Sequence, residues 1–354
     1  MPKERKNKMK KTFSLLLAAA LLLLSLTGCA QKQDTVVTKP ADTTEKGDDV
    51  KTPDPVDVKI AALKGPTAMG MVKFMSDNDD KLITDNNYSF EIAASADLVT
   101  PGLIQGTIDI AAVPANLASV LYNNTDGEIE VLAVNTLGVL YIVENGTGVN
   151  SVADLKGKTI YASGKGSTPE YALNYILKEN GIDPEKDVTV EWLSEHTACL
   201  NMLLSQEGSV AMLPQPFVTV AQSKSDIRVA LDLTDEWNAV QKDGNTASTM
   251  ITGVVVVRKQ FAKDNPDAVN AFLDHYKESV EYVKANNDEA AALVGKYDIV
   301  TEEVAKKALP ECNITFVEGD EMKTMLSGYL AVLYAQNPTA VGGKLPNDDF
   351  YYKR

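Results

Sequence analysis

The stretch LIQGTIDIAAVP, residues 103–114, and the later stretch LSQEGSVAMLP, residues 204–214, have the same construction. Each contains the end of a predicted helix, a glycine turn, a short run of apolar residues and a closing proline. In open sheets of alternating strands and helices, ligands bind outside the carboxyl ends of the strands. The repeated unit therefore predicts two similar lobes, although two unrelated helix-to-strand turns would produce the same likeness.

Short apolar runs alternate with helical patterns on both sides of these stretches. The first run is followed by a turn at Gly65 and a helical pattern over residues 68–75. This alternation predicts an α/β protein with mostly parallel sheets and helices on both faces. The predicted strands are residues 58–63, 89–93, 108–113, 131–134, 158–162, 188–193, 210–213 and 251–257.

A long amphipathic helix is predicted after Pro266. Asn265 is suited to cap it and Pro266 to its first turn. Its apolar residues recur at helical spacing, which indicates a core-facing stripe and leaves His275 beside the stripe, facing solvent. The stripe consists of Val269, Phe272, Leu273, Tyr276, Val280 and Val283.

The first 28 residues have the order of a secretion signal. Six basic residues precede an apolar run over residues 13–26, which is too short to span a bilayer comfortably, and small residues come before Cys29. The cysteine resembles that of a bacterial lipobox, which implies cleavage before Cys29 and lipid on its sulfur. A plain signal peptide or an uncleaved anchor is the alternative.

Residues 29–56 read as a lipidated cysteine followed by a flexible tether. The segment is rich in Thr, Asp, Lys and Pro and poor in large apolar residues, so it cannot offset the entropy of ordering. Its root-mean-square reach is roughly 28 Å. Lipid on Cys29 would therefore hold a folded body at the extracytoplasmic face of the cell membrane.

Charge and metal-ligand residues exclude several classes of function. The formal charge is −15, and loss of a leader with six basic residues and one acid makes it −20, which disfavours nucleic acid as a partner. His196 and His275 cannot by themselves form a three-histidine zinc site. Cys199 and Cys312 have no metal-binding spacing, and they are expected to be buried free thiols or, alternatively, a single disulfide.

Several segments together resemble the ABC-transporter substrate-binding proteins of the nitrate, sulfonate and thiamine-precursor branch. The likeness lies in the order and spacing of the segments, not in any single motif. It extends over residues 58–352. The segments are KGPTA (64–68), GTIDIA (106–111), VADLKGKTI (152–160), MLPQPF (212–217) and residues 261–269.

The resemblance implies a type II periplasmic-binding fold, in which two doubly wound lobes enclose a ligand in the cleft between them. The first lobe is expected to contain residues 57–141 and 251–354, and the second residues 142–250. Crossing strands are expected near residues 140–143 and 249–256. Where relatives commonly have an acid in the second-lobe motif, this chain has Gln215, so a charge is missing from the cleft wall.

Strand-to-helix loops provide the candidate ligand-binding residues of the first lobe. Amides from Gly65 to Ala68 and the Thr67 hydroxyl can meet a ligand oxygen, although Thr67 is equally suited to cap its helix. Asn116 offers a donor and an acceptor, with capping again the alternative. The first-lobe candidates are Gly65, Pro66, Thr67, Ala68, Pro114, Asn116 and Thr136.

The second-lobe candidates lie in corresponding loops. The glycines of residues 163–169 allow backbone to approach a ligand closely, but the spacing is not that of a P-loop. Ser167 and Thr168 can also cap a helix before Pro169. The second-lobe candidates are Ser167, Thr168, His196 and Gln215.

The scarcity of arginine constrains the ligand. The three arginines after Cys29, at positions 228, 258 and 354, fall outside these loops, so a guanidinium clamp for a carboxylate is not evident. An anion would depend on helix amides, with Lys64 or Lys165. We therefore expect a small polar or heterocyclic organic ligand, on which Tyr161, Tyr171 or Trp192 would stack if they are not ordinary core residues.

These expectations describe a monomeric transport receptor, without cofactor, metal or catalytic residues, that delivers its ligand to an ABC permease. An exported enzyme is the first alternative, because the resemblance extends to lyases and a pyrimidine synthase of the same fold. Against it, the chain has two histidines and no evident Ser-His-Asp or Cys-His order. A sensory or adhesive lipoprotein with a retained cleft is the second alternative.

Overall fold

A computed structural model describes residues 54–241 and 248–354. The expected leader, the Cys29 lipidation site and the tether up to residue 53 lie outside the described residues. Within the described ranges, no helix combines the length and apolar character needed to cross a bilayer.

The first of two sheets has six strands in the order β11-β4-β10-β3-β1-β2. Strands β2, β1 and β3 are parallel, whereas β10 runs antiparallel to both β3 and β4. The strands are β1 (Asp57–Leu63), β2 (Asn87–Ala93), β3 (Ile110–Pro114), β4 (Ile129–Leu137), β10 (Ile251–Arg258) and β11 (Ile314–Val317).

The second sheet has five strands in the order β7-β6-β8-β5-β9. Strands β7, β6 and β8 are parallel, and β5 is antiparallel to its neighbours β8 and β9. The strands are β5 (Leu140–Glu144), β6 (Thr159–Ser163), β7 (Thr189–Leu193), β8 (Val210–Pro214) and β9 (Arg228–Asp232).

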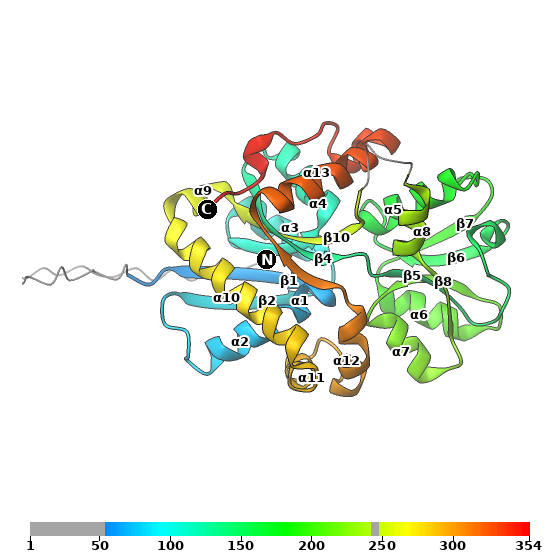
Figure 1. The fold of residues 1–354 in the computed structure, drawn as a ribbon, viewed down its shortest axis with the longest axis horizontal. Helices are drawn as coiled ribbons and strands as arrows, with labels where there is room; N and C mark the ends of the chain where they lie inside the picture. Colours follow the sequence, from blue (N-terminus) through cyan, green and yellow to red (C-terminus); the bar gives the residue numbers. More distant parts are fainter. Residues whose placement is uncertain (1–53, 242–247) are drawn as a thin grey trace, which may run out of the picture. The chain divides into compact units, whose positions relative to one another are not determined.

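The reversed strands β5 and β10 mark where the chain passes between the sheets (Figure 1). β5 begins at Leu140, opposite Pro214 at the carboxyl end of β8. In β10, Gly253 lies opposite Pro114 at the carboxyl end of β3. Because each crossing strand enters its sheet at the carboxyl ends of its neighbours, those ends lie at the crossings. This is the edge at which the sequence predicted ligand binding.

Helices cover both faces of the first sheet, as predicted. Along β1, Ile60 and Ala62 pack into one hydrophobic cluster and Ala61 packs into the other. The first cluster lies under α1 (Pro66–Met69), α2 (Val72–Asp79), α10 (Pro266–Ala285), α11 (Asn287–Lys296) and α12 (Glu302–Ala308). The second lies under α3 (Ala96–Gln105), α4 (Ala115–Asn124) and α13 (Gly319–Gln336).

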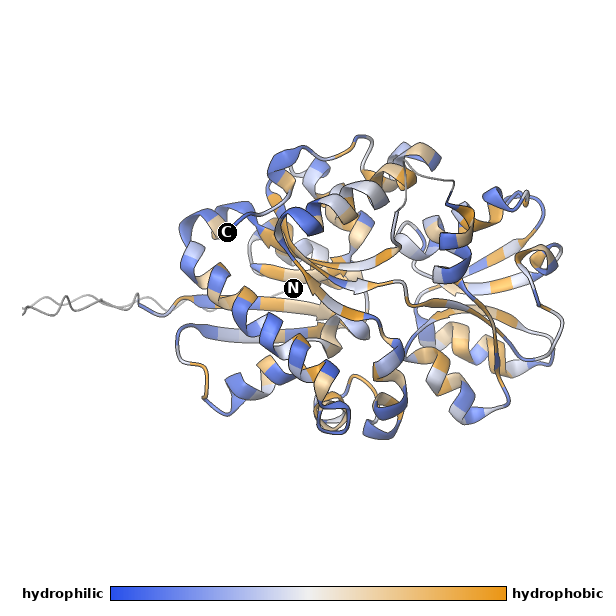
Figure 2. Cartoon of the chain, viewed as in Figure 1, coloured by the Kyte–Doolittle hydropathy of each residue, from blue (hydrophilic) through white to orange (hydrophobic). Residues whose placement is uncertain are grey.

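The second sheet is covered in the same way. Alternate residues of β5 face opposite sides, with Ile142 in one cluster and Val143 in the other. Strands of both sheets are largely apolar, whereas polar residues, blue in Figure 2, lie on the outer faces of the helices. The helices are α5 (Thr168–Glu179) and α8 (Leu233–Val240) on one face, and α6 (His196–Ser205) and α7 (Phe217–Lys224) on the other.

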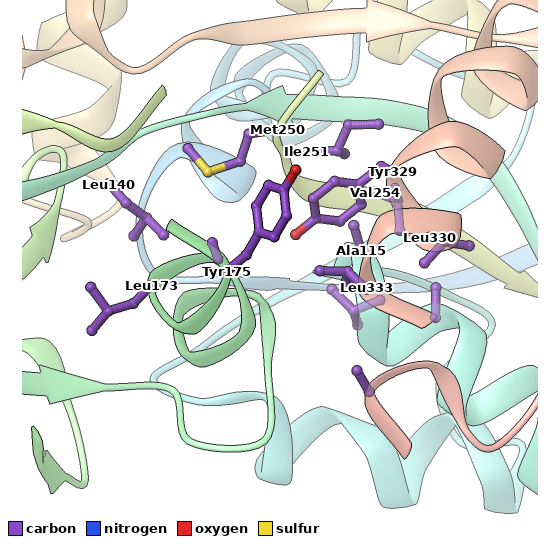
Figure 3. Packing of buried hydrophobic residues seen from close by; sticks show 14 of the residues in the cluster. Ala115, Leu140, Leu173, Tyr175, Met250, Ile251, Val254, Tyr329, Leu330 and Leu333 are labelled. Carbon is purple, nitrogen blue, oxygen red and sulfur yellow. The ribbon is translucent and has the colours of Figure 1, made fainter. Parts of the chain in front are cut away.

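One hydrophobic cluster continues from the first sheet into the second. Tyr329 of α13 lies 5.4 Å from Trp237 of α8 between ring centroids, and Trp237 lies 4.6 Å from Tyr175 of α5. Figure 3 shows side chains of α13, α5 and β10 pointing into this cluster. The two lobes, each built on one sheet, therefore share a core on the side away from α6 and α7.

The eight predicted strands are present with small shifts of their ends, and both quoted stretches have the predicted construction. Gly106 and Gly208 have φ of +77° and +82°, which suits glycine. The sequence analysis missed β9 and β11 and identified β5 only as a crossing. Both sheets contain reversed strands among the predicted parallel ones.

Two helix predictions need correction. The helix expected over residues 68–75 is divided at Gly70 and Met71 into α1 and α2. A Cβ on Gly70 would lie 3.1 Å from the Ile314 side chain, so a larger residue would crowd the packing there. Asn265 precedes α10 but does not cap it, because its amide donates to the Phe261 carbonyl. The predicted apolar stripe of α10 is buried.

The two cysteines of the described region are buried and unpaired. The Cys199 thiol donates to the Glu195 carbonyl, and Cys312 contacts the Met69 sulfur at 3.7 Å. Burial raises the pKa of Cys199 to about 11. Both residues therefore behave as small core residues and not as reactive thiols.

The first crossing depends on a glycine. A Cβ on Gly138 would overlap the Thr234 hydroxyl and lie 2.6 Å from the Met250 methyl. We predict that Gly138→Ala lowers the free energy of unfolding by about 1–3 kcal/mol through overpacking, measured by urea denaturation.

Gly328→Ala is the matched control for Gly138→Ala. Gly328 lies in α13 with no heavy atom within 4 Å of the added Cβ. The control should gain about 0.5–1 kcal/mol from helix propensity. Equal effects of the two substitutions would contradict the close packing at the crossing.

Candidate functional site

A cavity of about 410 Å³ lies between residues of the two lobes. Two other hollows, of about 300 and 290 Å³, are lined by residues of the first lobe alone. Nine of the eleven residues predicted to bind ligand line the cavity between the lobes, and Ala68 and Asn116 do not. The nine are Gly65, Pro66, Thr67, Pro114, Thr136, Ser167, Thr168, His196 and Gln215.

On the first-lobe side, the turn after β1 brings backbone to the cavity. Gly65 has φ of +139°, which only glycine adopts readily, and Pro66 then begins α1. The Thr67 hydroxyl donates to the Leu63 carbonyl at 2.8 Å. This contact ties the first turn of α1 to the end of β1, and it is not an N-cap. Ala68 points into the core below the cavity.

Two threonines line the cavity where β4 meets β10. The Thr136 hydroxyl donates to Asn135 Oδ1 at 3.2 Å, and the Thr252 hydroxyl donates to the Leu137 carbonyl. Thr252 is brought here by the antiparallel pairing of β10 with β4, in which Gly253 lies opposite Thr136. A Cβ on Gly253 would lie 2.9 Å from Thr67 Cγ2, so glycine lets these threonines converge.

Asn116 is fully buried and joins three segments of the chain. Its Nδ2 donates to the Ala340 carbonyl at 3.0 Å and to the Gly166 carbonyl at 3.3 Å. Its Oδ1 accepts a bond from the Thr168 hydroxyl at 3.3 Å. Asn116 thus connects α4 of the first lobe with the loop between β6 and α5 of the second.

On the second-lobe side, Ser163 ends β6 and contacts His196, the first residue of α6. The distance between Ser163 Oγ and His196 Nδ1 is 2.7 Å. Desolvation lowers the pKa of His196 from 6.5 to about 4, so the ring is neutral at pH 7. The His196 ring also packs on Phe217, with centroids 5.0 Å apart, and both residues line the cavity.

Gln215 provides an oriented amide. Its side chain is buried, and Oε1 accepts bonds from the Thr219 backbone N–H at 3.3 Å and the Thr219 hydroxyl at 2.9 Å. Because a backbone N–H can only donate, this contact identifies Oε1 and directs Nε2 elsewhere. Gln215 lines the cavity, and Nε2 has no hydrogen-bond partner within the described part of the chain.

The charged residues that line the cavity lie at its rim. Lys64, Asp97, Lys165 and Glu195 are all exposed, two with each sign. Lys64 also pairs with Asp298 at 3.8 Å. Among the described residues, the buried polar side chains of the lining are all uncharged: Thr136, Ser163, Thr168 and Gln215.

The arginines are engaged elsewhere, in keeping with the sequence analysis. Arg228 Nη2 lies 2.8 Å from Glu144 Oε2, and Arg258 Nη2 lies 2.6 Å from Asp109 Oδ1. Arg354 pairs with Asp274 and Glu318. Within the described residues, none of the three lines the cavity between the lobes.

Some lining residues were missed by sequence reasoning. Ser95, Ala96 and Asp97 follow the carboxyl end of β2, so the rule that identified Thr67 could have found them. Phe217 begins α7 three residues after the end of β8, so the same rule could have found it as well. Thr252 could not be found this way, because it comes from a reversed strand. Three aromatic rings that were considered for stacking on a ligand pack against the hydrophobic clusters instead and do not line the cavity: Tyr161, Tyr171 and Trp192. They are therefore core residues, the other alternative given by the sequence.

One family of proteins matches the sequence over residues 83–301. Its description is "ABC transporter, phosphonate, periplasmic substrate-binding protein". The match covers more than half of the chain. No curated protein sequence matches significantly.

Solved structures share the fold. An ABC transporter protein from Parabacteroides distasonis has a TM-score of 0.69 and 24% identity over 85% of this chain and 100% of its own. The periplasmic aliphatic sulphonate binding protein SsuA from Escherichia coli has a TM-score of 0.68 and 17% identity over 85% and 93%. At these identities the likeness shows the two-lobed fold and no shared ligand.

The contacts of Asn116 lead to a prediction about the loop between β6 and α5. Asn116→Ala should lower the free energy of unfolding by about 1–3 kcal/mol, because Thr168 and the Ala340 carbonyl lose a buried partner. Hydrogen exchange should rise at residues 164–168. Denaturation and exchange mass spectrometry measure these effects.

Asn124→Ala is the control for Asn116→Ala. Asn124 is the exposed last residue of the same helix. Its substitution should change stability by less than about 0.5 kcal/mol and leave exchange at residues 164–168 unchanged. Faster exchange in both variants would mean that α4 as a whole, and not Asn116, holds the loop.

Proposed function

Because the chain belongs to the phosphonate-type family of periplasmic substrate-binding proteins of ABC transporters, we propose that it captures a small organic molecule outside the cytoplasm and delivers it to an ABC permease. The ligand is enclosed between the two lobes, and its binding free energy favours the closed arrangement that docks on the permease. The chain acts as a monomer, and no cofactor takes part.

The cavity between the lobes is the observation that carries the proposal. Its lining comes from strand-to-helix loops at the carboxyl ends of β1 and β3 in one lobe, and of β6, β7 and β8 in the other. A ligand in contact with both sets of loops favours their approach. The volume of about 410 Å³ suits a small molecule.

The site is suited to binding and not to turnover. Ser163 and His196 have the spacing of a nucleophile and a base, but a histidine with a pKa of about 4 is a weak base at neutral pH. Within the described residues, no group of three acidic, histidine or cysteine side chains could hold a metal ion. We therefore propose that the ligand leaves chemically unchanged.

We further propose that lipid on Cys29 anchors the protein at the outer face of the cell membrane. The support is the basic, apolar and small-residue order of residues 1–28 before that cysteine. The polar tether would let the lobes open and close within reach of the permease.

Uptake by intact cells tests the transport function. Cells lacking the chain should leave in their medium a small molecule that parental cells deplete, and expression of the chain should restore depletion. The purified protein should bind that molecule and return it unaltered, as judged by mass spectrometry. Equal depletion by both strains, or conversion of the molecule by the purified protein, would refute the proposal.

Substitution of the lipidation site tests the anchor. Cys29→Ser should abolish incorporation of labelled palmitate and release the protein from the membrane fraction, because a serine oxygen does not replace the thioether-forming sulfur. Cys199→Ser, which changes a buried thiol, should keep both the label and the membrane location. Continued membrane association of the Cys29 variant would contradict lipid anchoring.

A further inference from the structure

Five of the eight serine and threonine residues in the described lining of the cavity already donate their hydroxyl protons within the chain. The Thr67 hydroxyl donates to Leu63, Ser167 donates to the Gly164 carbonyl at 2.8 Å, and Thr252 donates to Leu137. Thr136 and Thr168 donate to asparagine side-chain oxygens. A hydroxyl has a single proton, so these five groups can offer a ligand only lone pairs. They favour a ligand with N–H or O–H donors.

Carboxylates lie at three of the helix N-termini near the cavity, those of α3, α5 and α6, whereas α1, α4 and α7 have no acidic residue in their first turn. Asp97 lies in the first turn of α3, and Glu195 is the residue before α6. At α5, Glu170 Oε2 accepts a bond from the Gly166 N–H at 2.6 Å. A negative group at a helix N-terminus offsets the partial positive charge there. The three helix ends are thus poorly suited to a second negative group from a ligand.

The described lining of the cavity also contains no buried cation that could compensate an anion. Lys64 and Lys165 are exposed to water, as are the two acids of the lining, and the arginines are paired elsewhere. Moving an unpaired charge out of water is unfavourable. The formal charge of −15 adds long-range repulsion against an incoming anion. A cation also finds no buried acid in the described lining.

A buried side-chain amide and an aromatic surface complete the arrangement. Gln215 Nε2 is an uncharged donor from a buried, oriented amide, able to meet a carbonyl or ring nitrogen. The neighbouring rings of His196 and Phe217 form an apolar surface on the same side of the cavity. Such a surface suits a flat ring.

On the basis of the proposed function, we infer that the cavity selects an uncharged, planar molecule that carries N–H or O–H donors beside a carbonyl or ring-nitrogen acceptor. A carboxamide or lactam on a ring has this pattern. Sulfonates, phosphonates and carboxylates are disfavoured, because they offer only acceptors to the five hydroxyls that already donate, and because they bring a charge that no buried side chain of the described lining balances.

Matched sets of ligands test the charge preference. The purified protein is titrated calorimetrically with nicotinamide and nicotinate, uracil and orotate, benzamide, benzoate and benzylamine, and with ethanesulfonate and methylphosphonate. An uncharged member should bind at least about 30-fold more tightly than its ionised counterpart, because of the desolvation of charge. Its affinity should change less than about two-fold between about 20 and 500 mM NaCl.

Gln215→Glu tests the donor with the Thr219 contacts retained. Glutamate still accepts both bonds from Thr219 but presents a charged acceptor in place of Nε2. Affinity for the uncharged ligand should fall at least about ten-fold. Gln222→Glu makes the same change at an exposed position of α7 and should leave affinity within about two-fold.

Two kinds of result would overturn the inference. Tighter binding of a carboxylate or amine than of its uncharged counterpart, or of ethanesulfonate or methylphosphonate than of every uncharged compound in the set, would show that charge is selected, while leaving the transport function intact. If the Gln215→Glu variant binds the uncharged ligand with unchanged affinity, Gln215 Nε2 does not donate a hydrogen bond to that ligand. Absence of binding by every charge class would overturn the proposed receptor function itself, and this inference with it.

Discussion

The antiparallel pairing of the two crossing strands with their neighbours is the constraint on which the rest of the structure depends. β5 must start beside the carboxyl end of β8, and β10 beside that of β3, because each enters its sheet from the other lobe. This pairing brings the strand-to-helix loops of both lobes to one region. The hydrophobic core that runs from α13 to α5 and α8 then holds the lobes together on one side.

The residues that maintain the crossing also define the chemistry of the cavity. The chain leaves the first sheet at Leu137, the last residue of β4, and the Leu137 carbonyl accepts a hydrogen bond from the Thr252 hydroxyl. At the next residue, the Gly138 carbonyl accepts a hydrogen bond from the Asn313 amide at 2.5 Å. Thr136 lies opposite Gly253, where the absence of a side chain permits close approach. Hydroxyl protons that take part in hydrogen bonds at these crossings are not available to a ligand. Structural stability and ligand choice are therefore connected through the same side chains.

Much of the fold and part of the lining of the candidate site could be predicted from sequence, for one reason. Buried strands such as residues 210–213 are continuous apolar runs, and the polar loop after each strand lies at the carboxyl edge wherever the strand is placed. Thr67, His196 and Gln215 were identified in this way. Asn116 satisfied the same rule, yet its Nδ2 already donates to the carbonyls of Gly166 and Ala340, which are distant in sequence. Sequence position indicates the edge of the sheet but not which polar groups remain free.

The sequence by itself determined the alternation of strands and helices, the two similar units around Pro114 and Pro214, the charge balance and the order of basic, apolar and small residues before Cys29, because each depends on residues close together in the chain. The tertiary structure alone decided the reversal of β5 and β10, the entry of Thr252 into the cavity and the orientation of the Gln215 amide. These features depend on contacts between distant segments. Hydrogen-bond direction at such a contact is set by the partner, which local sequence does not specify.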